Sequence, residues 1–209
     1  MVIKVCGMRD PDNIHEVART GVTWMGMIFW DKSSRNVNMP EIAANAIPEG
    51  ISRVGVFVDE KPERMALVAR QCRLNVIQMH GSETPEILRQ TRQMTNAGVK
   101  LMKAISIAGN NDILLADTYA STADLLLFDT KCVSVGGSGR QFDWNILDGY
   151  HGTLPFLLSG GIGPDDIERL SQFSHPKMIG IDLNSRFEIS PGRKNPTLLK
   201  NFIEKYKEV

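Results

Sequence analysis

The strongest constraint on the fold is a regular alternation of short apolar runs with helix-like segments, which continues along the whole chain. Short apolar runs are typical of buried strands, and a proline near the start of a segment favours the first turn of a helix. We expect strands at Val2–Cys6, Trp24–Phe29, Ser52–Val58, Asn75–Gln78, Val99–Ile105, Asp124–Phe128, Pro155–Leu158 and Met178–Asp182. We expect helices at Pro11–Arg19 with Asp10 as N-cap, and at Pro40–Ile47, Pro62–Gln71, Pro85–Met94, Asn110–Thr118, Pro164–Phe173 and Pro196–Tyr206.

Eight strand–helix units in a chain of 209 residues, without a linker or a change of composition, predict an α/β protein folded as a single (β/α)8 TIM barrel. We expect one catalytic domain over residues 1–209. A doubly wound open sheet is the alternative. That fold usually has fewer strands, and the Gly-x-Gly-x-x-Gly fingerprint of a dinucleotide site is absent after the first expected strand. Side chains at the carboxyl ends of the strands are therefore the candidates for chemistry.

The charge balance narrows the class of partner. Lys and Arg total 24, as do Asp and Glu, so neither a nucleic acid nor a membrane surface is indicated as the main partner. No apolar stretch approaches the roughly 20 residues that span a bilayer, and the N-terminus enters a strand without the pattern of a signal peptide. We expect a cytoplasmic protein that binds a small molecule, with a monomer as the default.

The cysteines and histidines do not indicate a structural metal or a disulfide framework. Cys6, Cys72 and Cys132 are widely spaced and form no Cys-x-x-Cys pair, and the four histidines lack metal-ligand spacing. Cys72 falls in a helical segment, where we expect it to pack. We expect Cys132 to be a loop residue without a chemical role.

Cys6 ends the first expected strand and is followed at once by Gly7, which lets the backbone turn. Because side chains alternate along a strand, Cys6 shares a face with Lys4. A thiol at the active end of a barrel strand is a candidate for chemistry. Buried cysteines that only pack are common, and this segment alone leaves both interpretations open.

Asp129 ends the sixth expected strand, on the same face as Leu125 and Leu127. Burial at the end of an apolar strand would raise the pKa of its carboxyl group and keep a proton available for donation. The alternative is that Asp129 caps a turn or pairs with Lys131 or Arg140.

Glycine-containing segments follow the last strands at Gly136–Gly139 and Ser159–Gly163, and Asn184-Ser185 follows the eighth strand. Barrels commonly bind a phosphate group with the loops after strands seven and eight, where backbone N–H groups can approach the anion. The alternative is that these glycines only form turns. Elsewhere, Arg35 could hold a carboxylate in a bidentate contact or be a solvated surface arginine. His80 could face a ligand or orient its own loop.

Seven motifs together closely resemble the phosphoribosylanthranilate isomerase family, and they occur in the family's order from the first strand to the last. They are Ile3–Met8, Val54–Phe57, Gln78–Gly81, Phe128-Asp129, Gly136–Trp144, Ser159–Ile162 and Gly180–Ser185. The resemblance implies an Amadori rearrangement of N-(5-phosphoribosyl)anthranilate in tryptophan biosynthesis, with neither a cofactor nor a metal.

The resemblance also assigns expected roles to residues. Cys6 matches the family's general base and Asp129 its general acid. Substrate binding is expected from Arg35, with the anthranilate carboxylate as its ligand, and from Gln78 and His80; phosphate binding is expected from Gly137, Gly160, Gly161, Asn184 and Ser185.

A free thiol is only a few per cent ionised near neutral pH. Either the site must lower the pKa of Cys6 or the substrate must help, and Lys4 is the neighbour that could lower it.

The chain departs from the family pattern near the binding site. The segment Lys32–Arg35 lacks the usual proline, Arg186 and Phe187 replace a Gly-Val pair, and Asn195 replaces an Asp. These changes leave Cys6 and Asp129 untouched.

Two other classes of barrel are the alternatives: another phosphosugar enzyme and a non-catalytic phosphosugar-binding or regulatory barrel. A phosphosugar epimerase would need metal-binding His and Asp residues at strand ends, and an indole-glycerol-phosphate synthase would place lysines there. A non-catalytic phosphosugar-binding barrel would need neither an acid nor a thiol.

Overall fold

The computed structural model describes residues 1–130 and 142–208. It confirms the predicted barrel: eight parallel strands form a closed sheet in chain order, and β1 pairs with β8 to close it. The strands are β1 (Val2–Cys6), β2 (Trp24–Ile28), β3 (Ser52–Phe57), β4 (Val76–Met79), β5 (Lys100–Ile107), β6 (Leu125–Thr130), β7 (Phe156–Leu158) and β8 (Met178–Leu183).

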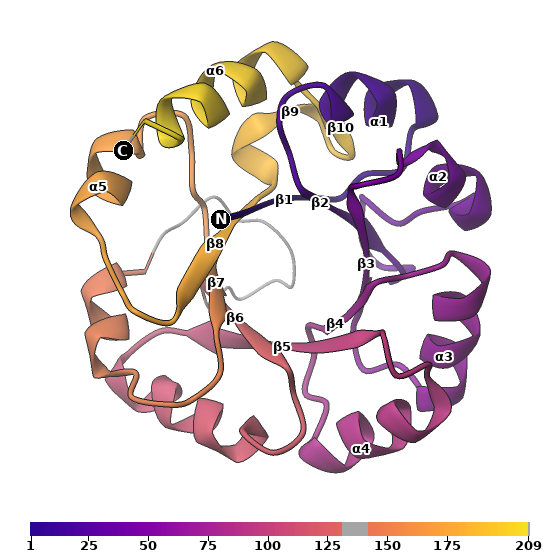
Figure 1. Cartoon of the computed structure of the whole chain (residues 1–209), viewed down its shortest axis with the longest axis vertical. Coiled ribbons are helices and arrows are strands. Elements are labelled where there is room, and N and C mark those ends of the chain that lie inside the picture. The colour runs from indigo at the N-terminus through magenta and orange to yellow at the C-terminus, as the bar shows by residue number, and fades with distance from the viewer. Residues whose placement is uncertain (131–141, 209) are drawn as a thin grey trace.

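Helices form an outer ring around the strands (Figure 1). They are α1 (Pro11–Ala18), α2 (Pro40–Ala46), α3 (Pro62–Gln71), α4 (Pro85–Met94), α5 (Ile167–Gln172) and α6 (Pro196–Tyr206). All of these except α5 begin with proline, whose fixed φ suits the first turn. Asp10 caps α1 as predicted, because its carboxylate accepts the Asn13 N–H at 2.8 Å.

The core has two parts, which follow from the alternation of side chains along each strand. Inward-facing side chains such as Val54, Val76, Leu125 and Leu127 fill the barrel, and outward-facing ones pack against the helices. Cys6 belongs to the inner cluster, together with the apolar residues of the neighbouring strands. The inner face of the sheet is therefore covered with side chains as far as the carboxyl ends of the strands, where Cys6 lies.

Two predicted helices differ from the prediction. Asn110–Tyr119 is a 3₁₀ segment (η1), which starts where the Asp112 carboxylate accepts the Ala108 and Gly109 N–H groups. Helix α5 begins at Ile167 rather than at Pro164, because the Gly163 N–H donates to Asp166 and forms a turn first.

Additional short elements were not predicted from the sequence. Trp144–Gly149 (η2) and Ser185–Phe187 (η3) are 3₁₀ turns, and β9 (Glu188–Ser190) pairs antiparallel with β10 (Arg193–Lys194). Figure 1 shows this hairpin beside α1, and the Lys194 N–H donates to Asn13 of that helix at 2.7 Å. The hairpin thus ties the chain after β8 back to the first strand–helix unit.

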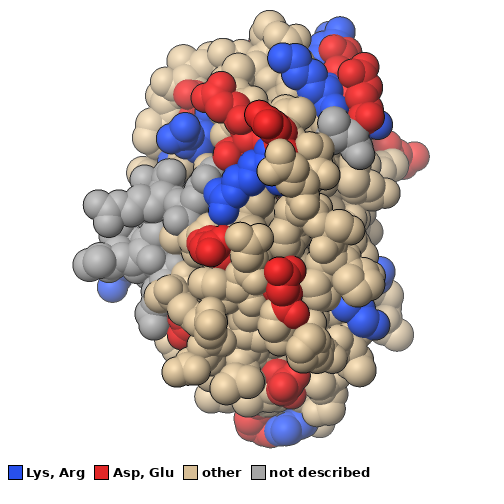
Figure 2. Space-filling view, turned by 90° about the vertical axis from the view of Figure 1, so that its left-hand side faces the viewer, with Lys and Arg blue, Asp and Glu red and all other residues tan. Residues whose placement is uncertain are grey.

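The surface has no extended field of one charge on the face shown in Figure 2, where acidic and basic side chains are interspersed among uncharged ones. Within the described ranges, no helix combines the length and the apolar character needed to cross a membrane.

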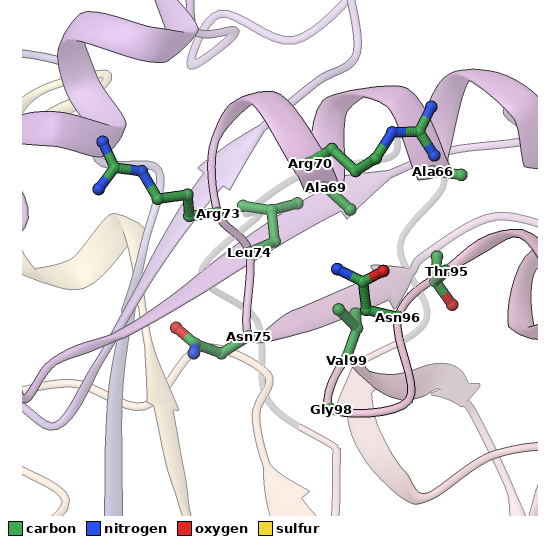
Figure 3. A pocket seen from close by; sticks show the side chains of 10 residues that line it. All are labelled: Ala66, Ala69, Arg70, Arg73, Leu74, Asn75, Thr95, Asn96, Gly98 and Val99. Atoms are coloured by element: carbon green, nitrogen blue, oxygen red, sulfur yellow. The ribbon is translucent and has the colours of Figure 1, made fainter.

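A pocket lies at the end of the barrel opposite the strands' carboxyl ends (Figure 3). Its walls are the last turns of α3, the residues leading into β4 and the loop between α4 and β5, including Arg70, Arg73 and Asn96. Since chemistry in barrels sits at the carboxyl-end face, this pocket is separate from the predicted site.

Candidate active site

The Cys6 thiol lies at the end of β1, and the residue is only 4 % exposed. Its partner in the register is Gly26 of β2, where a Cβ atom would lie 3.0 Å from the Cys6 Sγ and 3.3 Å from the Lys4 Cε. The missing side chain at Gly26 therefore leaves the space that the thiol and the lysine occupy together. As predicted, Cys6 and Lys4 share the inner face of the barrel.

Lys4 forms a fully buried ion pair across the β1–β8 junction. Its Nζ lies 2.8 Å from Oδ1 of Asp182, and the Ser159 hydroxyl donates to Asp182 Oδ2 at 3.4 Å. Burial lowers the pKa of Lys4, but the charges of Asp182 and Cys6 outweigh that effect and raise the pKa above its ordinary value. Lys4 therefore remains a cation directly below the thiol.

Burial raises the pKa of the Cys6 thiol, and the negative charge of Asp182 raises it further. Lys4 acts in the predicted direction, since both its charge and its hydrogen bond lower this pKa, and Lys194 also lowers it. The net shift is nevertheless upward. Of the two routes expected from the sequence, the first is wrong for the unliganded protein: the site does not lower the pKa of Cys6.

Asp129 lies at the end of β6, on the inner face with Leu125 and Leu127 as predicted. Its Oδ1 accepts the N–H of Thr130 at 2.8 Å, and its Oδ2 lies 3.2 Å from Nε2 of His80. The Asp129 side chain is 24 % exposed. The alternative partners Lys131 and Arg140 lie outside the described residues, as does Cys132.

Gln78 and His80 contact each other at the end of β4. The Nε2 atom of Gln78 lies 2.7 Å from Nδ1 of His80, so the two side chains and Asp129 form one chain of polar contacts. The sequence predicted both residues as substrate ligands. In the structure their nearest polar partners are each other and the carboxyl group of Asp129.

A second buried ion pair holds the loop that carries His80. Lys103 of β5 donates to the Gly81 carbonyl at 2.6 Å and to Glu83 at 3.0 Å, and Glu83 accepts the N–H groups of Gly81 and Asp59. This pair was not predicted from the sequence. The two residues are 20 positions apart, and neither belongs to a motif.

Arg35 is engaged by a carboxylate of this chain. Its Nε lies 2.9 and 3.1 Å from the two oxygens of Glu188, and its Nη2 lies 2.7 Å from Oε2. Lys194 and the Gly192 N–H also donate to Oε1 of Glu188, at 2.7 and 3.0 Å. Glu188 thus occupies one edge of the guanidinium group and leaves the edge formed by Nη1 and Nη2 for another carboxylate.

Arg35 and Glu188 each favour the charged form of the other. The hydrogen bonds that Arg35 donates to Glu188 raise the pKa of Arg35. Burial alone would raise the pKa of Glu188, but Arg35 and Lys194 lower it below its ordinary value. Burial lowers the pKa of Lys194, and the charge of Glu188 opposes that shift. The charges of Arg35 and Glu188 balance, so the cluster is net positive when Lys194 is protonated, and this charge favours an anionic ligand.

The predicted phosphate-binding residues are partly brought together. Gly160 and Gly161 follow β7 with φ of +95° and +75°, and a Cβ on Gly160 would overlap Thr130. Asn184 and Ser185 follow β8, the neighbouring strand, but the Asn184 side chain accepts Lys194 Nζ at 2.7 Å. Gly137 lies outside the described residues.

Arg186, one of the departures from the family pattern, is an exposed residue beside the loop after β7. A Cβ on Gly163 would lie 3.0 Å from its Nε. A cation therefore borders the glycine loop at a position where the family usually has glycine. In the part of the chain that the structure describes, no group of His, Cys, Asp and Glu residues could hold a metal ion.

Comparison with known proteins gives one consistent result. Residues 3–205 match the family model described as N-(5'-phosphoribosyl)anthranilate (PRA) isomerase. The N-(5'-phosphoribosyl)anthranilate isomerase of Phocaeicola vulgatus is 46% identical over 100% of this chain and 98% of that protein.

Solved structures agree with this result. The phosphoribosyl anthranilate isomerase of Thermotoga maritima is 31% identical, with a TM-score of 0.85 and complete coverage of both chains. A further structure of this isomerase, 28% identical with a TM-score of 0.82 over 100% of both chains, is a complex with reduced 1-(o-carboxyphenylamino)-1-deoxyribulose 5-phosphate.

Proposed function

Because the chain belongs to the N-(5'-phosphoribosyl)anthranilate isomerase family, we propose that Cys6 and Asp129 are the base and the acid of its reaction. The protein is an isomerase of tryptophan biosynthesis. It converts N-(5-phosphoribosyl)anthranilate to 1-(2-carboxyphenylamino)-1-deoxyribulose 5-phosphate. The observation that carries the assignment is that a thiol and a carboxyl group stand on the inner face at two strand ends of one barrel mouth.

The two groups share an electrostatic environment. Asp182 acts on the thiol of Cys6, and Asp129 and His80 act in turn on Asp182. A substrate at this mouth would thus meet a proton donor and a proton acceptor that come from different strands. Binding alone would require neither group.

Asp129 would open the ribose ring. Its proton passes to the ring oxygen as the C1–O bond breaks, so that the oxygen becomes a hydroxyl group and the C1–N bond becomes an iminium. Partial exposure of Asp129 leaves it reachable by substrate and by solvent.

Cys6 would then act as the base. Its thiolate takes the proton from C2, the electron pair of that C–H bond forms the C1–C2 double bond, and the iminium nitrogen becomes an amine. The resulting enol becomes the ketone product when C1 is protonated. Since burial raises the pKa of Cys6, the free enzyme holds a thiol, and the substrate's cationic iminium would favour the thiolate beside it.

Arg35 would bind the anthranilate carboxylate through its free Nη1–Nη2 edge. The contact between Arg35 and Glu188 fixes the plane of the guanidinium group, and the net positive charge of the cluster supports binding of an anion. Arg35 also lies beside Gly7, the residue after Cys6, since its Cδ would be 3.0 Å from a Cβ placed on Gly7, and the charge of Cys6 acts on the pKa of Arg35.

The phosphate group of the substrate would lie on the loops after β7 and β8, which carry Gly160, Gly161 and Ser185 and whose backbone N–H groups could donate to an anion. Arg186 would add a positive charge at the edge of this site. Gly137 and Asn184 remain predicted contributors.

The experiment is a fluorescence assay of N-(5-phosphoribosyl)anthranilate consumption by purified protein, by Cys6→Ala and by Asp129→Asn. Each substitution removes one proton-transfer partner, so turnover should fall by about 10²- to 10⁴-fold while the circular dichroism spectrum is retained. Full activity in either variant would contradict the assigned pair.

The same assay with a chelator tests the prediction that no metal is needed, and loss of activity would point to a metal enzyme. The expected cytoplasmic location, the single domain and the monomeric state remain predictions. Sedimentation analysis of the purified protein tests the last of these.

A further inference from the structure

The Oε1 atom of Gln78 is buried and has no hydrogen-bond partner among the described residues. Gln78 contacts His80, which in turn contacts the proposed acid Asp129. Gln78 is 1 % exposed. Its neighbours in the register, Val56 on β3 and Met102 on β5, are apolar and offer no donor side chain. Because unsatisfied buried oxygens are costly, this position calls for an explanation.

The orientation of the Gln78 amide determines where His80 carries its proton. An amide NH₂ group can only donate, so the contact from Gln78 Nε2 to His80 Nδ1 makes Nδ1 an acceptor. The proton of the neutral ring is then on Nε2, where it is donated to Asp129 Oδ2. In this arrangement Oδ2 has no proton to give.

The other amide orientation gives the opposite result. Turning the amide by half a rotation places Oε1 beside Nδ1, where Oε1 accepts a hydrogen bond from Nδ1–H and gains the partner that it lacks, while the NH₂ group gives up its contact with Nδ1. His80 Nε2 then either accepts a proton from Asp129 or, in the imidazolium form, donates one to it. Only this orientation allows the His80–Asp129 pair to hold an extra proton.

We propose that Gln78 is a positioning residue, which turns its Oε1 to His80 and so keeps on the His80–Asp129 pair the proton that opens the substrate's ring. This inference rests on the proposed role of Asp129. When the shared proton passes to the ring oxygen, a neutral His80 protonated on Nδ1 and an Asp129 carboxylate remain. The lone pairs of Nε2 and Oδ2 then face each other, which favours uptake of the next proton from solvent.

The other charged groups near the His80–Asp129 pair have their own ion-pair partners, so we expect a substitution of Gln78 to leave their charges unchanged. Asp182 of β8 acts on the pair from across the barrel and is balanced by Lys4. The Lys103–Glu83 ion pair holds the loop that carries His80. Within the described parts of the chain, the Thr130 N–H donates to the other oxygen of Asp129. A change in pH dependence on substitution of Gln78 would therefore arise at His80 and Asp129.

The test compares Gln78→Glu with Gln78→Met in the pH profile of kcat/KM. The carboxylate of Gln78→Glu can only accept, as the proposed orientation requires, and it holds the shared proton more tightly. For Gln78→Glu we expect kcat to stay within about threefold of wild type. The descending limb of its kcat/KM profile should lie at higher pH than in the wild-type enzyme. Gln78→Met removes the acceptor, so kcat should fall about tenfold and the limb should move to lower pH.

Equal loss of activity in both variants, or an unmoved limb in both, would overturn the proposal. Since a buried carboxylate can prevent folding, ¹⁵N NMR of His80 in the wild-type protein provides a second measurement. We expect a protonated Nδ1 at the pH of maximal activity, and an unprotonated Nδ1 there would also overturn it. Full activity of Asp129→Asn would instead remove the proposed acid, whatever the Gln78 variants do.

Discussion

The two sides of the barrel mouth control protons in different ways. Cys6 is almost fully buried above a lysine and an aspartate that are themselves buried, whereas the side chains of Asp129 and His80 are 24 % and 20 % exposed. At Cys6, the proposed base, burial and neighbouring charges set the pKa of the thiol. Asp129, the proposed acid, instead contacts His80 and is partly open to solvent. The difference fits the proposed roles, because the acid must regain a proton from solvent in each cycle, whereas the base holds its proton in the free enzyme and becomes a thiolate only beside the substrate.

The largest effect should come from breaking the charged support of Cys6. Lys4→Met leaves Asp182 buried and unpaired, which should reduce the free energy of unfolding by about 3–5 kcal/mol. Loss of the Lys4 charge, which outweighs that of Asp182 at Cys6, raises the pKa of the thiol further. Because the base acts as a thiolate, the ascending limb of kcat/KM should move to higher pH. Chemical denaturation and the pH profile measure the two effects.

Lys103→Met is the matched control for this prediction. It breaks an equally buried ion pair, with Glu83, on the other side of the mouth. The free energy of unfolding should fall to a similar degree, while the ascending limb stays in place, because the charges that shift the pKa of Cys6 are those of Lys4, Asp182 and Lys194. An ascending limb that moves equally in both variants would mean that general destabilisation explains the shift.

A smaller effect is expected at the carboxylate-binding edge. Glu188→Gln retains the size of the side chain but loses one of its two acceptor oxygens, so Arg35 is held less firmly. We expect KM to rise about tenfold with little change in kcat, in contrast to the kcat effects of the proton-transfer residues. Steady-state kinetics measures both constants.

Arg35→Lys is the companion variant, since it keeps the charge and removes the planar group. If Arg35→Lys raises KM and Glu188→Gln does not, the guanidinium group needs no orienting partner. If neither variant changes KM, the anthranilate carboxylate binds elsewhere.

Much of the scaffold could be predicted because its signals are local. Strand β1 and helices α3, α4 and α6 have the bounds expected from apolar runs and prolines. Cys6 and Asp129 could be identified as candidates because they lie at the ends of β1 and β6. The contact between Gln78 and His80 was also within reach, because residues two apart at a strand end share a face.

The groups that tune the site could not be predicted because they meet only in the closed barrel. Lys4 and Asp182 are 178 positions apart, and Arg35 and Glu188 are 153 apart. The sequence indicated that Arg35 could bind a carboxylate, but it gave no sign that a carboxylate of the same chain occupies one edge. The direction of the Cys6 pKa shift was equally hidden, since it depends on how completely the fold excludes water.

The most direct test of the division between base and acid is a kinetic isotope effect with N-(5-phosphoribosyl)anthranilate deuterated at C2 of the ribose. Cys6→Ser should slow removal of the C2 proton and give a large primary effect on kcat/KM. Asp129→Asn should slow ring opening, which leaves the C2–H bond intact, and give an effect near unity. A large effect in Asp129→Asn with none in Cys6→Ser would contradict the account.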